Sequence, residues 1–146
     1  AISILAACEL GKRRAMEKAQ ERTSIDSSKA IYEYLHPRMQ DLDVEEAWIM
    51  LLNQHYKLIK AMAISHGGIT ETAVDVRVIL KEALLCNATV LVLAHNHPSN
   101  HIQPSKSDDQ LTQRVKKACE AVRIYFLDHV IVTDGTYYSY HDSGRL

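Results

Sequence analysis

The chain has few cysteines, almost no net charge and no long hydrophobic run, and each shortage argues against a class of protein. Its three cysteines, at positions 8, 86 and 119, are far apart and form no Cys-x-x-Cys pair. This spacing argues against a disulfide framework and favours a reducing, cytoplasmic compartment. A net charge of −1, from 17 basic and 18 acidic residues, gives no overall attraction to nucleic acid or to an anionic membrane. The longest apolar run, residues 47–52, is far shorter than the roughly 20 residues that span a bilayer.

The rest of the composition is that of a folded protein with one main domain. The 146 residues are 47% hydrophobic and 24% charged, which is ordinary for a protein with a buried core. Residues 2–22 carry apolar side chains at broadly helical spacing, and the polar residues 23–28 follow them like a linker. We therefore expect an N-terminal helical arm over residues 1–27 and a main domain over residues 28–146.

Within the main domain, strand-like apolar runs and helical patterns alternate. Ser28 is placed to cap a helix that ends before Pro37. After this helix we expect two more, at 74–86 and 105–122, and strands at 48–52, 57–65, 89–94, 128–132 and 137–140. The order β-β-α-β-α-β-β predicts an α/β domain in which helices flank a mixed β-sheet.

The residues that carry chemistry follow the apolar strand at 89–94. His95 and His97 are two residues apart, so both imidazoles lie on one side of an extended chain. Asp108 returns a carboxylate at the start of the next helix. Two nitrogens and one oxygen suit zinc and leave a fourth tetrahedral position for water, as in a catalytic site. The pattern predicts a hydrolytic zinc centre, since zinc lowers the pKa of bound water from about 15.7 to about 7.

Asp108 also has a structural interpretation, because Ser105-x-x-Asp108 has the spacing of a helix capping box. In such a box the serine caps the helix and the acid three residues later bonds back to the serine. Glu or Gln is more usual at that position, which favours the interpretation of Asp108 as a metal ligand. Asp109 is adjacent and is easily confused with it.

These residues resemble the JAMM/MPN metalloprotease domain, and in particular its bacterial RadC branch. The pattern of that family is an upstream Glu, then His-x-His-Pro, a short loop and Ser-x-x-Asp. Three segments, at 45–53, 88–98 and 127–132, resemble RadC segments in the same order, and the resemblance covers residues 28–146. It implies a cytidine-deaminase-like JAMM/MPN fold.

The resemblance also implies roles for individual residues. His95, His97 and Asp108 correspond to zinc ligands, Ser105 to a residue that supports the developing oxyanion, and an upstream glutamate to the general acid and base. Alignment on the apolar segment after Trp48 makes this glutamate Glu46, with Glu45 as the alternative.

The chain departs from the RadC pattern at two loop positions. Asn100 stands where glycine is usual, and His101 where aspartate is common. Asparagine tolerates positive φ, so the turn can survive. We interpret His101 as an exposed loop residue. His129, which precedes the apolar residues 130–132, is interpreted as a core histidine, with support of the metal site as the alternative.

The leading hypothesis is a zinc-dependent metallohydrolase, a peptidase or isopeptidase with a peptide or protein substrate. The alternative is a DNA repair or recombination factor whose metal domain is accessory or catalytically silent. Its support is the basic cluster of Lys12-Arg13-Arg14 with Lys18 and Arg22, for which a solvated helix face is the simpler interpretation. The consecutive residues His95-Asn96-His97 spell HNH, but an HNH nuclease is excluded, because in that family the three letters stand for residues spread over a hairpin and a helix. A cytidine deaminase is excluded, because the chain has no Pro-Cys-x-x-Cys motif.

Overall fold

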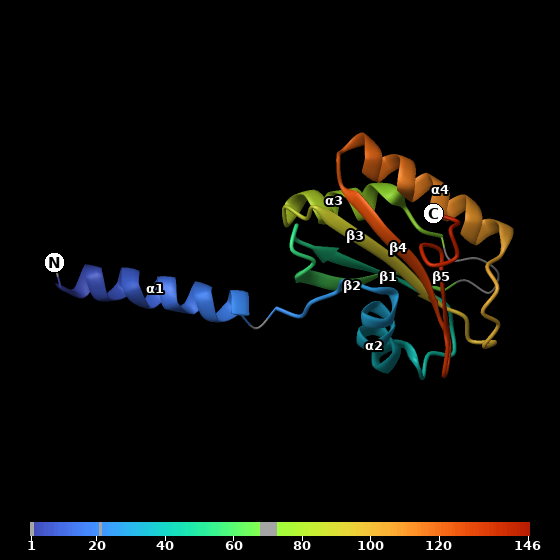
Figure 1. Cartoon of the computed structure of the whole chain (residues 1–146), viewed down its shortest axis with the longest axis horizontal. Coiled ribbons are helices and arrows are strands. Elements are labelled where there is room, and N and C mark those ends of the chain that lie inside the picture. Colours follow the sequence, from blue (N-terminus) through green and yellow to red (C-terminus); the bar gives the residue numbers. More distant parts are fainter. Residues whose placement is uncertain (1, 21, 68–72) are drawn as a thin grey trace.

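Helices cover both faces of a mixed β-sheet in the computed structural model of this chain (Figure 1). The structure describes residues 2–20, 22–67 and 73–146. In these residues the helices and strands are, in chain order, α1 (Ile2–Gln20), α2 (Ser28–Met39), β1 (Glu46–Leu52), β2 (Leu58–His66), α3 (Val76–Leu85), β3 (Val90–Asn96), α4 (Lys106–Ala121), β4 (Tyr125–Val132) and β5 (Tyr137–Ser139).

The strands of the main domain lie in the order β2-β1-β3-β4-β5. β1 is antiparallel to both β2 and β3, and β5 is antiparallel to β4. β3 and β4 are parallel, which requires a crossover connection, and α4 supplies it. The N-terminal end of α4 lies beside the carboxyl end of β3. The predicted element order and the mixed sheet are therefore confirmed.

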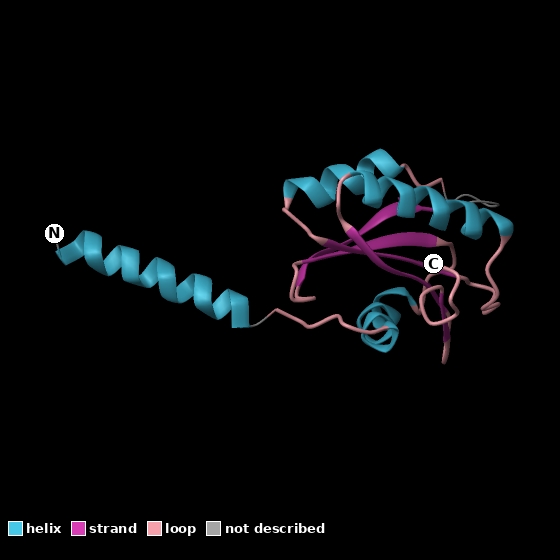
Figure 2. Cartoon of the chain, turned by 45° about the horizontal axis from the view of Figure 1, so that its top comes forward, coloured by secondary structure: helices cyan, strands magenta, loops and turns pink. Residues whose placement is uncertain are grey.

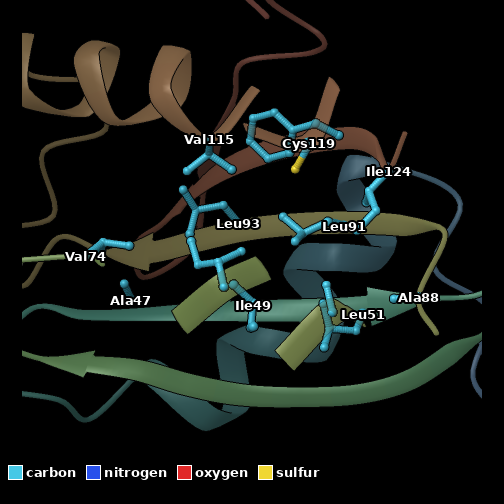
Figure 3. Packing of buried hydrophobic residues seen from close by; sticks show 13 residues of the cluster. Ala47, Ile49, Leu51, Val74, Ala88, Leu91, Leu93, Val115, Cys119 and Ile124 are labelled. Carbon is cyan, nitrogen blue, oxygen red and sulfur yellow. The ribbon is translucent and has the colours of Figure 1, made fainter. Parts of the chain in front are cut away.

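The alternation of side chains along the strands divides the core into two layers. On one face, β1 and β3 pack against α3 and α4, and Figure 3 shows Leu91 and Leu93 of β3 beside Val115 and Cys119 of α4. On the other face, the even-numbered residues of the same strands pack against α2, which lies on the opposite side of the sheet from α3 and α4 (Figure 2). Every residue of β3 is buried, so this strand is a rigid base for whatever follows it.

Helix α2 differs from the sequence prediction at both ends. Ser27, not Ser28, caps it, and the Ser27 side chain accepts a hydrogen bond from the backbone N–H of Ala30 at 3.2 Å. Pro37 lies inside the helix, which continues to Met39. Proline is tolerated here because it falls in the last turn, where the missing N–H removes a single helical bond.

Helix α1 extends away from the sheet and the other helices (Figures 1 and 2). Its side chains from position 3 to 13 are exposed, including Ile4, Leu5 and Leu10, each at 70%. The predicted helix over 2–22 is confirmed, with its end at Gln20. The division of the chain into an arm and a domain at residue 28 stays a prediction. Within the described ranges, no helix combines the length and the apolar character needed to cross a membrane.

Candidate metal centre

The carboxyl end of β3 carries His95 and His97 out of the sheet. In the antiparallel pairing of β1 with β3, Ala47 lies opposite His95. Extending this register by two residues places Glu45 opposite His97. Side chains alternate along a strand, so these residues all lie on the face that α3 and α4 cover, the same face as Leu93.

Four side chains converge at this point, from three separate segments of the chain. Glu45, His95, His97 and Asp108 each offer a ligand atom, and these atoms all lie within 4.8 Å of one another. The two histidine Nε2 atoms are 2.9 Å apart, and Asp108 Oδ1 is 3.2 Å from His95 Nε2. Asp108 Oδ2 is 3.6 Å from His97 Nε2, and Glu45 Oε1 is 3.8 Å from His95 Nε2. The structure thus brings together the three predicted ligands.

Asp108 caps helix α4 and reaches the cluster at the same time. Its backbone N–H donates to Ser105 Oγ at 3.1 Å, and the Ser105 N–H donates to Asp108 Oδ2 at 2.7 Å. The capping box therefore exists and fixes the carboxylate, while Oδ1 remains directed at His95. Among the described residues nothing accepts the Ser105 hydroxyl hydrogen, and Ser105 lines the cleft above the cluster. The two interpretations of Asp108 do not compete.

The electrostatics of the cluster keep Asp108 ionised. Burial opposes the charged carboxylate, but hydrogen bonds with His95 and His97 outweigh burial, and the pKa of Asp108 falls far below its usual range. For His97, burial lowers the pKa, while Asp108 and the carbonyl of His101 raise it by more, so the pKa ends above its ordinary value. The cluster is therefore built to hold positive charge beside a carboxylate.

The donor atoms fit a divalent metal ion. His97 Nδ1 lies 2.5 Å from the carbonyl oxygen of His101. A carbonyl can only accept, so Nδ1 keeps a ring proton, and Nε2 is the nitrogen whose lone pair a metal ion would meet in place of a proton. This lone pair faces His95 Nε2 and the Asp108 carboxylate. Two nitrogens bound to one tetrahedral zinc at about 2.05 Å lie roughly 3.3 Å apart, close to the 2.9 Å found here.

A cleft of about 730 Å³ opens above the cluster. Its floor is formed by the four clustered side chains, and its walls include the apolar residues Val74, Leu93 and Leu111. A concave site with a few converging polar groups and an apolar lining is typical of a ligand or substrate site.

The expectation that Glu46 serves as the acid–base residue does not agree with this geometry. Glu46 points to the other face of β1, where Oε2 accepts from Trp48 Nε1 at 3.0 Å and Oε1 lies 2.7 Å from His66 Nδ1. The structure places Glu45 at the cluster instead. The physical reason is the alternation of side chains along a strand. Glu45 is four residues before the buried Ile49, so the two side chains lie on the same face. That signal was available in the sequence.

Three other polar residues near the cluster have distinct positions. Asp109 faces away from it, accepting from the Tyr140 hydroxyl at 2.8 Å and pairing with Arg145. The His101 side chain is exposed, as expected, and the residue contributes its carbonyl oxygen. His129 is fully buried, as a core histidine is, but its Nε2 also lies 2.8 Å from His95 Nδ1.

Asn96, between the two histidines, is a residue that sequence reasoning missed. It points to the opposite face from His95, and it is buried. Its Oδ1 accepts from the backbone N–H of Glu46 at 2.7 Å, and its Nδ2 donates to the carbonyl of Val44 at 3.0 Å. Asn96 therefore holds the peptide groups on both sides of Glu45.

Comparison with known proteins gives one family and close relatives. The profile of the family described as RadC-like JAB domain matches residues 25–145. A UPF0758 protein of Porphyromonas gingivalis is 42% identical over 147 residues, which cover 100% of this chain and 65% of that protein. One from Flavobacterium johnsoniae is 42% identical over 144 residues, covering 99% of this chain and 63% of that protein. One from Haemophilus ducreyi is 35% identical over 141 residues, covering 97% and 63%. The chain thus spans less than two thirds of the length of these relatives.

Proposed function

Because this chain belongs to the RadC-like JAB domain family, we propose that it is a metal-dependent hydrolase of amide bonds, a peptidase or isopeptidase with zinc as its cofactor. The observation that carries this proposal is the convergence of two imidazoles and one carboxylate on a single point, with a second carboxylate beside them. Three protein ligands leave a coordination position open, which distinguishes catalytic from structural zinc sites.

The residues of the chain divide the chemistry between them. His95, His97 and Asp108 would hold the metal ion, which would act as a Lewis acid and lower the pKa of water. Glu45 stands at the edge of the cluster, where it takes a proton from the attacking water and returns it to the leaving amine. The free hydroxyl hydrogen of Ser105 is placed to donate to the carbonyl oxygen as negative charge develops on it.

Metal analysis and two matched substitutions test this function. Protein purified without chelator is expected to contain stoichiometric zinc and to cleave members of a peptide and isopeptide library, and chelation is expected to stop the cleavage. Glu45→Gln is expected to retain zinc and lower kcat by about 10²–10⁴-fold. Glu46→Gln, the adjacent control on the other face of β1, is expected to leave kcat almost unchanged. Protein without zinc, or cleavage that survives Glu45→Gln, overturns the proposal.

The alternative of a DNA-associated factor rests on α1. Lys12 and Arg13 are exposed there, but Arg13 pairs with Glu9 at 3.3 Å, and the side chain of Arg14 lies outside the described part of the structure. Binding of duplex DNA by the whole chain, with an affinity that falls steeply as salt rises, is the result that favours this function.

A further inference from the structure

Behind the cluster lies a buried chain of polar side chains that the proposed chemistry does not use. His129 is fully buried, with Nε2 at 2.8 Å from His95 Nδ1 and Nδ1 at 2.6 Å from Thr112 Oγ1. Thr112 is also fully buried, on the inner face of α4. The Tyr140 ring stacks on the His129 ring, with centroids 5.0 Å apart and planes 5° from parallel. The ring of His129 is therefore held between fixed partners.

The hydroxyl of Thr112 determines where the protons lie along this chain. It donates its single hydrogen to the carbonyl oxygen of Asp108 at 2.7 Å, so towards His129 the oxygen can only accept. His129 Nδ1 must then carry a proton. His129 is fully buried, and its two ring nitrogens face a hydroxyl and another imidazole rather than a carboxylate, so the ring is neutral and its Nε2 accepts. The donor to that nitrogen is His95 Nδ1.

We propose that Thr112 and His129 are positioning residues that hold a proton of His95 on Nδ1, so that Nε2 is the nitrogen that His95 offers to a metal ion. His97 reaches the same state through the carbonyl of His101. Both imidazoles then keep a proton on Nδ1, and Nε2 is the atom on which each ring would bind a divalent metal ion in place of a proton. That the cluster binds a metal ion rests on the proposed function. The positions of the protons on His95 and His129 do not depend on it.

The opposite arrangement shows what the hydroxyl prevents. With its proton on Nε2, His129 would donate to His95 Nδ1 and drive the His95 proton to Nε2. That proton would lie between the two Nε2 atoms, which are 2.9 Å apart, and would block a metal ion from His95. Replacing the Thr112 hydroxyl with a methyl group removes the acceptor that makes this arrangement unfavourable.

The matched pair Thr112→Val and Thr112→Ser tests the proposal. Valine keeps the shape of threonine without its hydroxyl, and serine keeps the hydroxyl. In metal-free whole chain labelled with ¹⁵N in its histidine rings, long-range ¹H–¹⁵N correlation spectra are expected to show His95 protonated on Nδ1 in wild type and in Thr112→Ser. In Thr112→Val the proton is expected to shift towards Nε2. Zinc affinity by competition titration is expected to fall about 10- to 100-fold in Thr112→Val and to recover in Thr112→Ser.

The wild-type spectrum decides the matter even if Thr112→Val fails to fold. The absence of a proton on His95 Nδ1 in the folded, metal-free wild type overturns the proposal. A folded Thr112→Val protein with an unchanged His95 tautomer and the zinc affinity of Thr112→Ser also overturns it, because His129 is then a packing residue only. His129→Phe, which keeps a ring on Tyr140, is a second variant with the same expected loss of affinity. Neither readout involves hydrolysis, so inactivity towards peptides refutes the proposed function and leaves this inference standing.

Discussion

Replacing Asn96 with alanine is expected to displace Glu45 without removing a metal ligand. The Asn96 amide makes two hydrogen bonds, of 2.7 and 3.0 Å, to the peptide groups on either side of Glu45. Their loss leaves one donor and one acceptor without partners in a partly buried place, which costs about 1–2 kcal/mol each. The free energy of unfolding is then expected to fall by about 2–4 kcal/mol. For a chain of this size, this corresponds to a decrease in Tm of roughly 6–16 °C.

Thermal unfolding followed by circular dichroism measures the loss of stability, and steady-state peptide hydrolysis measures the displacement. We expect kcat of Asn96→Ala to fall about 10- to 100-fold, because misplacing a catalytic group by about 1 Å can cost that much. Asn53→Ala is the matched control. The Asn53 side chain also makes two bonds to backbone, accepting from His55 N at 2.9 Å and Lys57 N at 3.1 Å, but at the far end of β1. The substitution Asn53→Ala is expected to lower Tm and to leave kcat unchanged. A folded Asn96→Ala protein with wild-type kcat refutes the reasoning.

Three further predictions concern the metal, the backbone beside Glu45 and a buried thiol. Zinc at 100 times its dissociation constant is expected to raise the free energy of unfolding by about 2.7 kcal/mol, measured by thermal unfolding. If His97→Ala keeps this gain, His97 is not a metal ligand. In Gly67→Ala the new Cβ lies 2.7 Å from the Glu45 carbonyl oxygen, so the backbone at Glu45 must shift. We expect kcat to fall and the zinc affinity, measured by calorimetry, to stay unchanged. Equal losses of kcat and zinc affinity contradict this prediction. Burial raises the pKa of Cys119 from 9.0 to about 11, so the folded chain keeps a proton that the unfolded chain loses. This contribution to stability is full below pH 9 and is lost as pH rises to about 11. Urea unfolding is therefore expected to show a smaller loss of unfolding free energy over this pH range in Cys119→Ala than in wild type. Equal losses in the two proteins contradict the role given to Cys119.

The elements of the fold were predictable because their signals are local. Apolar runs mark β1 and β3, and the Ser105 cap with apolar residues at helical spacing marks α4. The end of α2 was not predictable from Pro37 alone, because Met39, beyond the proline, is buried in the same core cluster as Ile31 and Leu35, and this packing is tertiary. The strand order was also outside local reach, since it depends on pairings between residues far apart in the chain.

The site was predictable only where its residues are close in sequence. His95, His97 and Asp108 stand within one strand–loop–helix unit, so their spacing alone suggested a common target. The contacts of Asn96 and His129 join residues 50 and 34 positions apart, and no spacing rule reaches so far. Glu45 is a different case. Strand alternation pointed to it, and alignment on the following segment misdirected the choice by one residue, which reverses the face of the strand.

The parallel pairing of β3 with β4 also bears on the order in which the molecule forms. Pairing two parallel strands requires the whole crossover between them to be closed into a loop, and such long-range closures are slow. None of the four clustered side chains belongs to β4, so their convergence depends on the pairing of β1 with β3 and on the docking of α4 rather than on this closure. The buried His129 that contacts His95 does belong to β4, so this support reaches the site only once the crossover has closed.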